Sequence, residues 1–142
     1  MSVAESDSAH LKRLLAPLVG APVREARLSE LGGSFISIRL GGSLIWVHLS
    51  AWKVESDSEF LVACEDRRDF IRASIAQLDG RSLHSIAVSD FLDITFDFNG
   101  LRLMLFNTFA IDANLEMWSV ELSSGQTLFV NSGGSWKLLP RH

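Results

Sequence analysis

Apolar and polar residues alternate most regularly between positions 92 and 107, where the chain reads LDITFDFNGLRLMLFN. Such alternation is typical of strands with one buried face. The dipeptide Asn99-Gly100 interrupts it, and this pair favours a two-residue turn in which both central residues have positive φ. The pattern therefore predicts a β-hairpin in which Asp97 lies across from Arg102 and forms a cross-strand ion pair with it.

A second segment, residues 34–49, repeats this pattern in a weaker form, with Gly41-Gly42 at its centre. A two-residue loop at these glycines pairs Ile38 with Ile45. In both predicted hairpins one face is apolar, and a mixture of large apolar and polar residues occupies the other. The two segments therefore predict the same supersecondary unit, used twice.

Two other segments carry the apolar spacing of an amphipathic helix. The first helix is predicted to begin at Ser6 or Ser8 and to end near Pro17. The second is predicted to run from Asp66, which is a suitable N-cap residue, to Leu78. Shorter alternating segments predict further strands at residues 23–28, 59–64, 83–88, 116–122 and 127–131.

The predicted elements recur in one order along the chain. A shift of 60 residues places Gly20 on Gly80, and beyond residue 33 a shift of 58 residues places Phe60 on Trp118. We therefore expect an internal duplication, because helix, glycine, strand and hairpin follow one another in the same way twice. The predicted repeats are about residues 6–65 and 66–131, followed by a C-terminal tail at residues 132–142.

Neither predicted unit can bury its apolar face alone, so the two units must pack together. The predicted fold class is α+β, in which a unit of one helix and about four antiparallel strands occurs twice with pseudo-twofold symmetry. The sheets either stack face to face or join into one long curved sheet, and the pattern leaves both arrangements open. With 142 residues, residues 1–142 are expected to form a single domain with a substantial core.

Composition excludes several classes of function. The net charge of −4 argues against nucleic acid as a partner, because binding to phosphates needs a basic field, whereas it suits a basic protein partner. No apolar run is long enough to cross a membrane, and the polar N-terminal residues do not form a secretory signal, so a cytoplasmic protein is expected. The single cysteine, Cys64, excludes an internal disulfide and is expected to be a buried, unreactive thiol.

No arrangement of residues predicts catalysis, a cofactor or a bound metal ion. The four histidines are not spaced as zinc ligands, and there is no second cysteine. Asp93 and Asp97 share a strand face but lie too far apart for a catalytic carboxylate pair. We therefore expect a non-enzymatic protein. The enzyme hypothesis that stays open uses His48 together with an aspartate as an acid–base pair.

The second face of the two hairpins is more apolar than a solvated sheet face should be. Its members are Phe35, Trp46, His48, Asp93, Asp97, Met104 and Phe106. Either the two helices cover this face, or another molecule does. Aromatic residues and methionine surrounded by acidic residues suit a protein interface, so this set is the candidate interaction surface. A small apolar ligand held between the sheets is the alternative, and the face is also compatible with a homodimer.

Residues 117–136 read MWSVELSSGQTLFVNSGGSW. This segment resembles the end of small, uncharacterised bacterial domains in which a tryptophan-containing strand, a glycine turn and a Gly-Gly segment recur. Some of those domains are encoded among toxin-immunity genes. The resemblance implies an immunity or interaction role, in which an acidic surface would block a basic toxin. It assigns no role to an individual residue.

Overall fold

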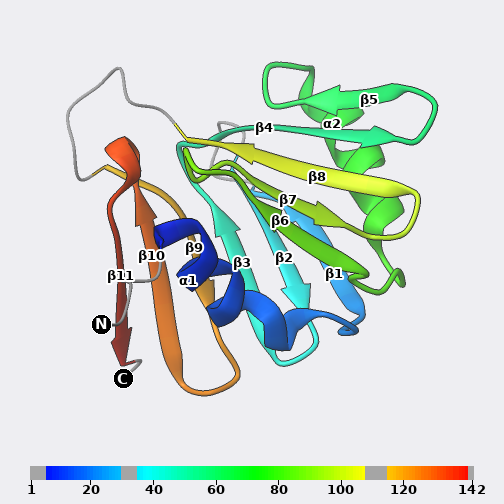
Figure 1. Ribbon diagram of the computed structural model, residues 1–142. Coiled ribbons are helices and arrows are strands. Elements are labelled where there is room, and N and C mark those ends of the chain that lie inside the picture. Colours follow the sequence, from blue (N-terminus) through cyan, green and yellow to red (C-terminus); the bar gives the residue numbers. More distant parts are fainter. Residues whose placement is uncertain (1–5, 30–34, 108–114, 141–142) are drawn as a thin grey trace, which may run out of the picture.

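The computed structural model describes residues 6–29, 35–107 and 115–140, which form an α+β fold with two α-helices and eleven strands (Figure 1). Helix α1 spans Asp7–Leu15 and α2 spans Arg68–Ile75, and a 3-10 turn follows each helix, at Ala16–Leu18 and Ala76–Leu78. The first five strands are β1 (Val23–Leu28), β2 (Ile36–Leu40), β3 (Ser43–Val47), β4 (Ala51–Ser56) and β5 (Phe60–Ala63). The other six are β6 (Ser85–Val88), β7 (Ile94–Asp97), β8 (Leu101–Phe106), β9 (Glu116–Glu121), β10 (Gln126–Asn131) and β11 (Trp136–Pro140).

The strands form two antiparallel sheets. Sheet 1 has the strand order β1-β2-β3-β9-β10-β11, and sheet 2 has the order β5-β4-β8-β7-β6. Helix α1 precedes β1–β5 and α2 precedes β6–β11, so the arrangement is roughly duplicated. Each sheet nevertheless contains strands of both halves, since β9 pairs with β3 and β4 pairs with β8. The expectation that each half forms its own sheet is therefore wrong. The halves exchange strands, and the exchange covers an edge of each hairpin that would otherwise be open.

Both predicted hairpins form with the predicted registers. Ile38 pairs with Ile45 across the glycine turn, and Phe96 pairs with Leu103 across the second turn. Asn99 in the second turn has a φ of 60°, as a turn of this type requires. The register was predictable because the turn position and the alternation of apolar residues fix it together.

The two helices differ in how they begin. Of the two predicted caps of helix α1, Ser6 and Ser8, the structure uses Ser6, whose Oγ accepts a hydrogen bond from Ala9 N at 3.2 Å. Helix α2 begins after Arg67, whose side chain makes no capping hydrogen bond. The prediction of Asp66 as the cap is wrong, because its carboxylate instead accepts a hydrogen bond from Ala63 N at 2.8 Å and closes the turn after β5.

The alternation of apolar residues predicts neither β4 nor β11. Strand β4 has only two inward apolar side chains, Trp52 and Val54, and this pattern is too short to distinguish a strand. Strand β11 lies within the segment predicted to be a tail, residues 132–142. It pairs with β10 along its whole length and extends sheet 1 by one strand. The segment that follows the predicted repeats therefore contains a strand that the sequence pattern does not indicate.

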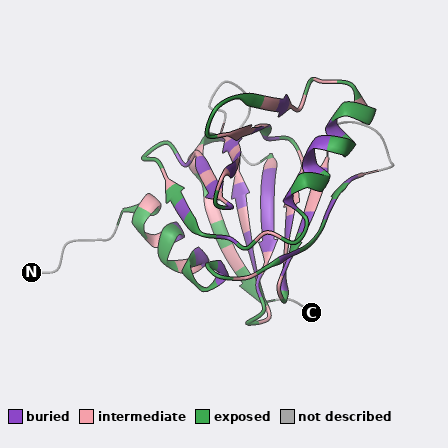
Figure 2. Cartoon of the chain, turned by 90° about the vertical axis from the view of Figure 1, so that its right-hand side faces the viewer, coloured by how far each residue is buried: buried purple, intermediate pink, exposed green. Residues whose placement is uncertain are grey.

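The inward faces of the two sheets enclose one hydrophobic core (Figure 2). Trp52 from sheet 2 and Trp118 from sheet 1 are the largest fully buried side chains. Helix α1 lies along β6, and α2 lies along β1 and β5 (Figure 1). Leu15 of α1 and Ile71 of α2 are fully buried, so the two helices close the core at the sides of the sheets.

The exchanged strands β4 and β9 occupy equivalent positions in the two sheets. Each has an inward tryptophan near its start, Trp52 or Trp118, followed two residues later by an inward valine, Val54 or Val120. Their offset in the sequence is 66 residues, so the predicted match of Phe60 with Trp118 is wrong. The reason is the connection between β8 and β9, which is longer than the connection between β3 and β4.

The segments that follow the two helices contact each other reciprocally at a seam formed by residues 20–23 and 80–83. Gly20 N donates a hydrogen bond to Leu83 O at 2.7 Å, and Gly80 N donates one to Val23 O at 2.8 Å. The two glycines have φ values of 94° and 82°, which glycine alone adopts readily. The seam therefore joins equivalent positions of the two halves through equivalent bonds.

Candidate interaction surface

The seven residues of the predicted interaction surface lie on two different faces. Three are on the outer face of sheet 1 and four are on the outer face of sheet 2: Phe35, Trp46 and His48 in the first group, and Asp93, Asp97, Met104 and Phe106 in the second. Because the two sheets share one core, their outer faces point away from each other, and the structure does not unite the two groups. All seven residues are half-exposed. The helices lie at the sides of the sheets, so the interpretation in which they cover this second face is wrong.

Phe35, Trp46 and His48 form a contiguous group, here called the aromatic cluster. The ring centre of His48 lies 6.2 Å from that of Trp46, and the ring planes are nearly parallel, at 19°. The ring centre of Phe35 lies 6.3 Å from that of His48. Trp46 belongs to β3 and His48 follows its last residue, so the alternation of a strand places both on the same face. Contacts between the rings hold the cluster together.

Two glutamates of β9 contact the polar atoms of this cluster. Glu116 Oε2 lies 3.2 Å from His48 Nε2, and Glu121 Oε2 accepts a hydrogen bond from Trp46 Nε1 at 3.3 Å. Sequence reasoning missed both glutamates, because the pairing of β3 with β9 is not visible in the local pattern. The segment Trp-x-Val-Glu occurs twice, ending at Glu55 and at Glu121, and this repeat could have indicated Glu121. Glu55, at the equivalent position, also binds a side chain of the neighbouring strand.

An aromatic row continues from the cluster across sheet 1. Trp46, Ser119 and Phe129 are cross-strand neighbours on β3, β9 and β10, and Lys137 follows on β11. Lys137 Nζ lies 5.4 Å from the centre of the Phe129 ring, which is a cation–π contact. Ser119 points outward yet is only 4% exposed. The large side chains on either side of it form a nearly continuous surface over that part of the sheet.

The two aspartates of the predicted surface have structural roles on sheet 2. Asp93 Oδ1 accepts a hydrogen bond from Asn107 N at 2.7 Å, which ties the start of β7 to the end of β8. Asp97 Oδ1 accepts one from Asn99 N at 2.9 Å within the hairpin turn. Because backbone amides already occupy these carboxylate oxygens, Asp93 and Asp97 contribute to local structure more than to a binding surface.

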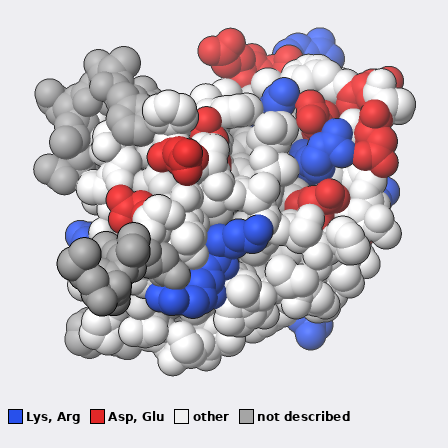
Figure 3. All heavy atoms as spheres, in the orientation of Figure 1, with Lys and Arg blue, Asp and Glu red and all other residues white. Residues whose placement is uncertain are grey.

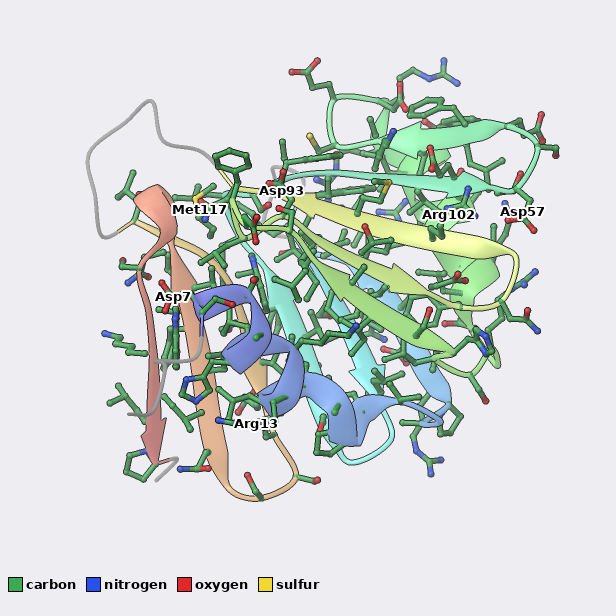
Figure 4. The ribbon with its side chains drawn as sticks, in the orientation of Figure 1. Asp7, Arg13, Asp57, Asp93, Arg102 and Met117 are labelled. Atoms are coloured by element: carbon green, nitrogen blue, oxygen red, sulfur yellow. The ribbon has the colours of Figure 1, made fainter. Side chains whose placement is uncertain are left out.

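The predicted ion pair between Asp97 and Arg102 does not form, although the two residues are cross-strand neighbours. Arg102 instead points toward β4 and the residue that follows it. Its Nη1 lies 2.6 Å from Asp57 Oδ1, and its Nη2 lies 3.3 Å from Glu55 Oε1 (Figure 4). Lys53 Nζ completes this network at 3.2 Å from Glu55 Oε2. Charged side chains of both signs gather over this end of the molecule in Figure 3. The prediction failed because it considered one neighbouring strand, whereas β8 has two.

Charges in this network shift two pKa values. The hydrogen bond from Lys53 lowers the pKa of Glu55, the positive charges of Lys53 and Arg102 act in the same direction, and partial burial opposes them. The hydrogen bond to Asp57, together with the contacts to Glu55, raises the pKa of Arg102. Within this network the charges of Lys53 and Arg102 therefore compensate those of Glu55 and Asp57.

The candidate catalytic and metal-binding side chains are few in the part of the chain that the structure describes. No group of three or more His, Cys, Asp or Glu side chains is placed there to hold a metal ion. The pair of His48 and Glu116 is within hydrogen-bonding distance, with a glutamate where an aspartate was expected, and it lies on an open sheet face. Cys64 follows the end of β5 and is half-buried, so the expectation of a fully buried thiol is wrong.

Several hollows open at the surface of the molecule. One of about 410 Å³ lies at the seam, where Arg81, His84 and Asn99 contribute to its wall. Another of about 200 Å³ lies between α1 and β6. Between the sheets, by contrast, side chains such as Ile38 and Leu103 are fully buried in the core.

Comparison with models of protein families, with characterised proteins and with solved structures gives no match to this chain. Among the helices in the described ranges, none has the length and apolar character needed to cross a membrane. The geometry of the surface is therefore the basis on which a function can be argued.

Proposed function

We propose that this protein is a non-enzymatic binding module whose partner is another protein, and that the aromatic row of sheet 1 makes the contact. The observation that carries this proposal is the aromatic cluster of Phe35, Trp46 and His48, which stands on a sheet face away from both helices. Aromatic side chains dominate the centres of protein interfaces, because they bury a large apolar area with few rotatable bonds.

The proposed partner is a basic protein, of the kind that an immunity protein would block. Two features support this charge preference. The chain has a net charge of −4, and the cluster is bordered by Glu116 and Glu121, which are held on the rigid strand β9. A basic side chain of the partner could approach these carboxylates beside an apolar contact. The toxin-immunity setting itself rests on the resemblance of residues 117–136.

The duplication is also part of the proposal. We infer that the two halves descend from one unit and are related by a pseudo-twofold axis at the seam. The reciprocal hydrogen bonds of Gly20 and Gly80 support this relation, because a twofold contact repeats each bond in the opposite direction. The equivalent places of Trp52 and Trp118 support it independently.

The two alternative functions, binding of a small apolar ligand and enzymatic catalysis, have less support. An apolar ligand between the sheets would need space that buried core side chains fill. The hollow at the seam is open and partly polar, with Arg81 and His84 in its wall. An enzyme using His48 and Glu116 has the required acid–base distance of 3.2 Å. Those two side chains are 34% and 37% exposed, however, and a solvated pair of this kind lacks the enclosed environment of most catalytic sites.

The test uses a matched pair of positions on the two sheets. Tagged full-length protein captures its partner from a lysate of the source cells, and the affinity of the purified pair is then measured for wild type, Trp46→Ala and Met104→Ala. Met104 occupies the place on sheet 2 that Trp46 occupies on sheet 1. We expect Trp46→Ala to weaken binding about 30-fold, as for a typical interface hot spot, and Met104→Ala to change it less than about threefold.

Two results would contradict this proposal. Equal effects of the two substitutions would show that the outer face of sheet 1 is not the interface. A dimer of the purified chain that dissociates on Trp46→Ala would assign the face to a second copy of this protein. Binding of a basic partner should also weaken as salt concentration rises, because salt screens the attraction of the glutamates.

A further inference from the structure

The two hairpin turns meet the seam in different ways. In the first half the turn lies against the seam, because Gly41 N donates a hydrogen bond to Pro22 O at 2.9 Å. Asn99 is the equivalent turn residue of the second half, and its N–H group donates instead to Asp97 Oδ1 at 2.9 Å. The second turn is therefore not tied in this way to Ser82, the seam residue that pairs with Pro22 and corresponds to it.

The hollow of about 410 Å³ opens between the second turn and the seam. Arg81 and Ser82 of the seam line it, together with Asn99 of the turn. The first half has Ala21 at the place of Arg81, and this short side chain packs on the first turn. The packing is so close that a Cβ atom on Gly41 would lie only 3.2 Å from Ala21 Cβ. The first turn therefore closes onto the seam, whereas the second turn leaves a hollow.

The side chain of Arg81 lies in the wall of this hollow and reaches across to the second turn. Its Nε donates a hydrogen bond to Gln77 O at 3.1 Å, and its Nη1 donates one to Asn99 O at 3.3 Å. Both acceptors are neutral carbonyl groups, and no carboxylate of the described residues pairs with Arg81. The two bonds hold the half-buried guanidinium in place and leave its Nη2 group without a partner among those residues. An uncompensated positive charge is therefore fixed beside the hollow.

The remaining polar groups of the wall have the same preference. None of the described residues that line the hollow is an aspartate or a glutamate. His84 adds an exposed ring, which has no hydrogen-bond partner in the described part of the chain. The carboxylates of the adjoining segments, Asp79 and Asp97, accept hydrogen bonds from backbone amides and lie outside the lining. The hollow therefore favours an anion, because an arginine donor binds an anionic oxygen most strongly.

We propose that this hollow binds the phosphate group of a small organic molecule. The side chains of Arg81, His84 and Asn99 bring donors to the hollow from separate segments, and a tetrahedral phosphate accepts hydrogen bonds from several directions at once. A phosphate monoester also carries a charge of about −1.5 to −2 at neutral pH and three acceptor oxygens, which is more than a carboxylate offers. The Nη2 group of Arg81 makes the principal contact.

The size of the hollow and its apolar rim indicate that the phosphate belongs to a larger molecule. A volume of about 410 Å³ leaves room beside a phosphate group. Val19 contributes to the lining with a side chain that is 46% exposed, and an apolar body attached to the phosphate would cover it. The site is separate from the aromatic row of sheet 1, so it adds a ligand to the proposed binding module and leaves the surface for its protein partner free.

The first test compares three probes by NMR of the labelled full-length protein at constant ionic strength. The probes are inorganic phosphate, phenyl phosphate and benzoate, which has the same ring as phenyl phosphate and a carboxylate in place of the phosphate. We expect phenyl phosphate to shift the amide resonances of Ser82 and His84 and to bind at least about tenfold more tightly than benzoate. It should bind at least about threefold more tightly than inorganic phosphate, because its ring contacts Val19.

The second test locates the site with substitutions. Arg81→Ala introduces the residue found at the equivalent position 21 and should weaken binding of phenyl phosphate at least about tenfold, through loss of a charge-assisted hydrogen bond. The matched control is Arg24→Ala, which removes an exposed arginine from the position in the first half that corresponds to His84, and it should change the affinity less than about twofold. His84→Ala should weaken binding about threefold, and it tests the site independently if Arg81→Ala disturbs the turn.

Several results would overturn the proposal. No shift at Ser82 or His84 with any probe would mean that the hollow is not a binding site. Equal affinity for phenyl phosphate and benzoate would mean that it does not recognise phosphate. Equal losses of affinity in Arg81→Ala and Arg24→Ala would mean that phosphate associates with basic side chains in general. Inorganic phosphate that binds as tightly as phenyl phosphate would exclude an organic molecule as the preferred ligand.

Discussion

The outer faces of the two sheets occupy equivalent places and have different chemistry. Trp46 and His48 on sheet 1 correspond to Met104 and Phe106 on sheet 2, and the rings of the first pair stack at 6.2 Å. On sheet 2, Arg102 instead gathers acidic neighbours into an ion-pair network. One face therefore carries stacked aromatic rings, and on the other Arg102 is paired with acidic side chains.

The inward faces of the two sheets differ far less than their outward faces. Trp52 and Trp118 are both 1% exposed, and the valine that follows each of them two residues later is fully buried. Close packing restricts the inward residues, because a change of volume there leaves a cavity or a clash. Outward residues face solvent and have no such restriction. The two sheets therefore have similar inward packing at these positions and differ in the chemistry of their outer faces.

The largest effect should come from the buried tryptophans. Trp52→Ala and Trp118→Ala are each expected to lower the free energy of unfolding by about 3–5 kcal/mol, because each leaves a large cavity in the shared core. Trp46→Ala is the control, since its side chain is half-exposed, and it should cost well under half as much. Urea unfolding measures all three. A loss at one buried tryptophan that is no greater than at Trp46 would contradict the equivalence of the two sheets.

Substitutions of the two glycines at the seam should have the next largest effect on the free energy of unfolding. Gly20→Ala and Gly80→Ala are each expected to cost about 1–2 kcal/mol, because a Cβ atom is unfavourable at their positive φ values. Gly80→Asn is the control and should cost less, since asparagine tolerates this conformation better. Thermal and urea unfolding provide the comparison. Very different losses at Gly20 and Gly80 would argue against a symmetric seam.

The ion-pair network of sheet 2 should have a smaller and pH-dependent effect. Arg102→Leu introduces the residue found at the equivalent position 44 of sheet 1, and it is expected to cost about 0.5–1 kcal/mol at neutral pH, allowing for partial solvent exposure. Lys53 first, and then Arg102, hold the pKa of Glu55 below its ordinary value of 4.5. A carboxyl whose pKa is lowered by folding stabilises the protein above its unfolded pKa, and this contribution disappears as pH falls through the folded pKa.

The difference between wild type and Arg102→Leu should therefore be complete near pH 7 and should shrink below pH 4.5. Urea unfolding at several pH values measures it. A difference that is the same at about pH 3.5 as at neutral pH would show that the loss comes from packing of the arginine side chain and not from its charge.

The smallest effect on stability should come from the reciprocal change on sheet 1. Leu44 is the cross-strand neighbour of Glu121, as Arg102 is of Glu55. Leu44→Arg should alter the free energy of unfolding by less than about 0.5 kcal/mol, because an exposed pair contributes little. It should nevertheless weaken the proposed binding of a basic partner, since the new charge competes for Glu121. Unchanged partner affinity would remove this glutamate from the proposed interface.

Local patterns predicted the fold well where one strand and its turn determine the outcome. Both hairpin registers and the N-cap Ser6 are confirmed. The errors at Asp66 and Arg102 share a cause, because each side chain had a choice of partners and bound one that the local pattern does not show. Strand β4 was missed because two inward residues are too few to distinguish a strand from a loop.

The candidate site was predicted only in part. The alternation of β3 placed Trp46 and His48 on one face, and the structure confirms this placement and adds that their rings stack. The predicted surface also included Asp93, which lies on the other sheet and binds a backbone amide. Glu116 and Glu121 were missed, because they reach the aromatic cluster from a strand of the other half of the chain.

The sequence by itself determined the hairpins, the helices, the faces of the hairpin strands and the recurrence of one order of elements. These follow from periodicity and turn chemistry, which act between residues close together in the chain. The tertiary structure decided that the halves exchange β4 and β9, that the helices close the sides of the core, and that one predicted surface becomes two opposite faces. Those outcomes depend on which distant edges pair, and pairing is set by the burial of the whole core, which no local pattern contains.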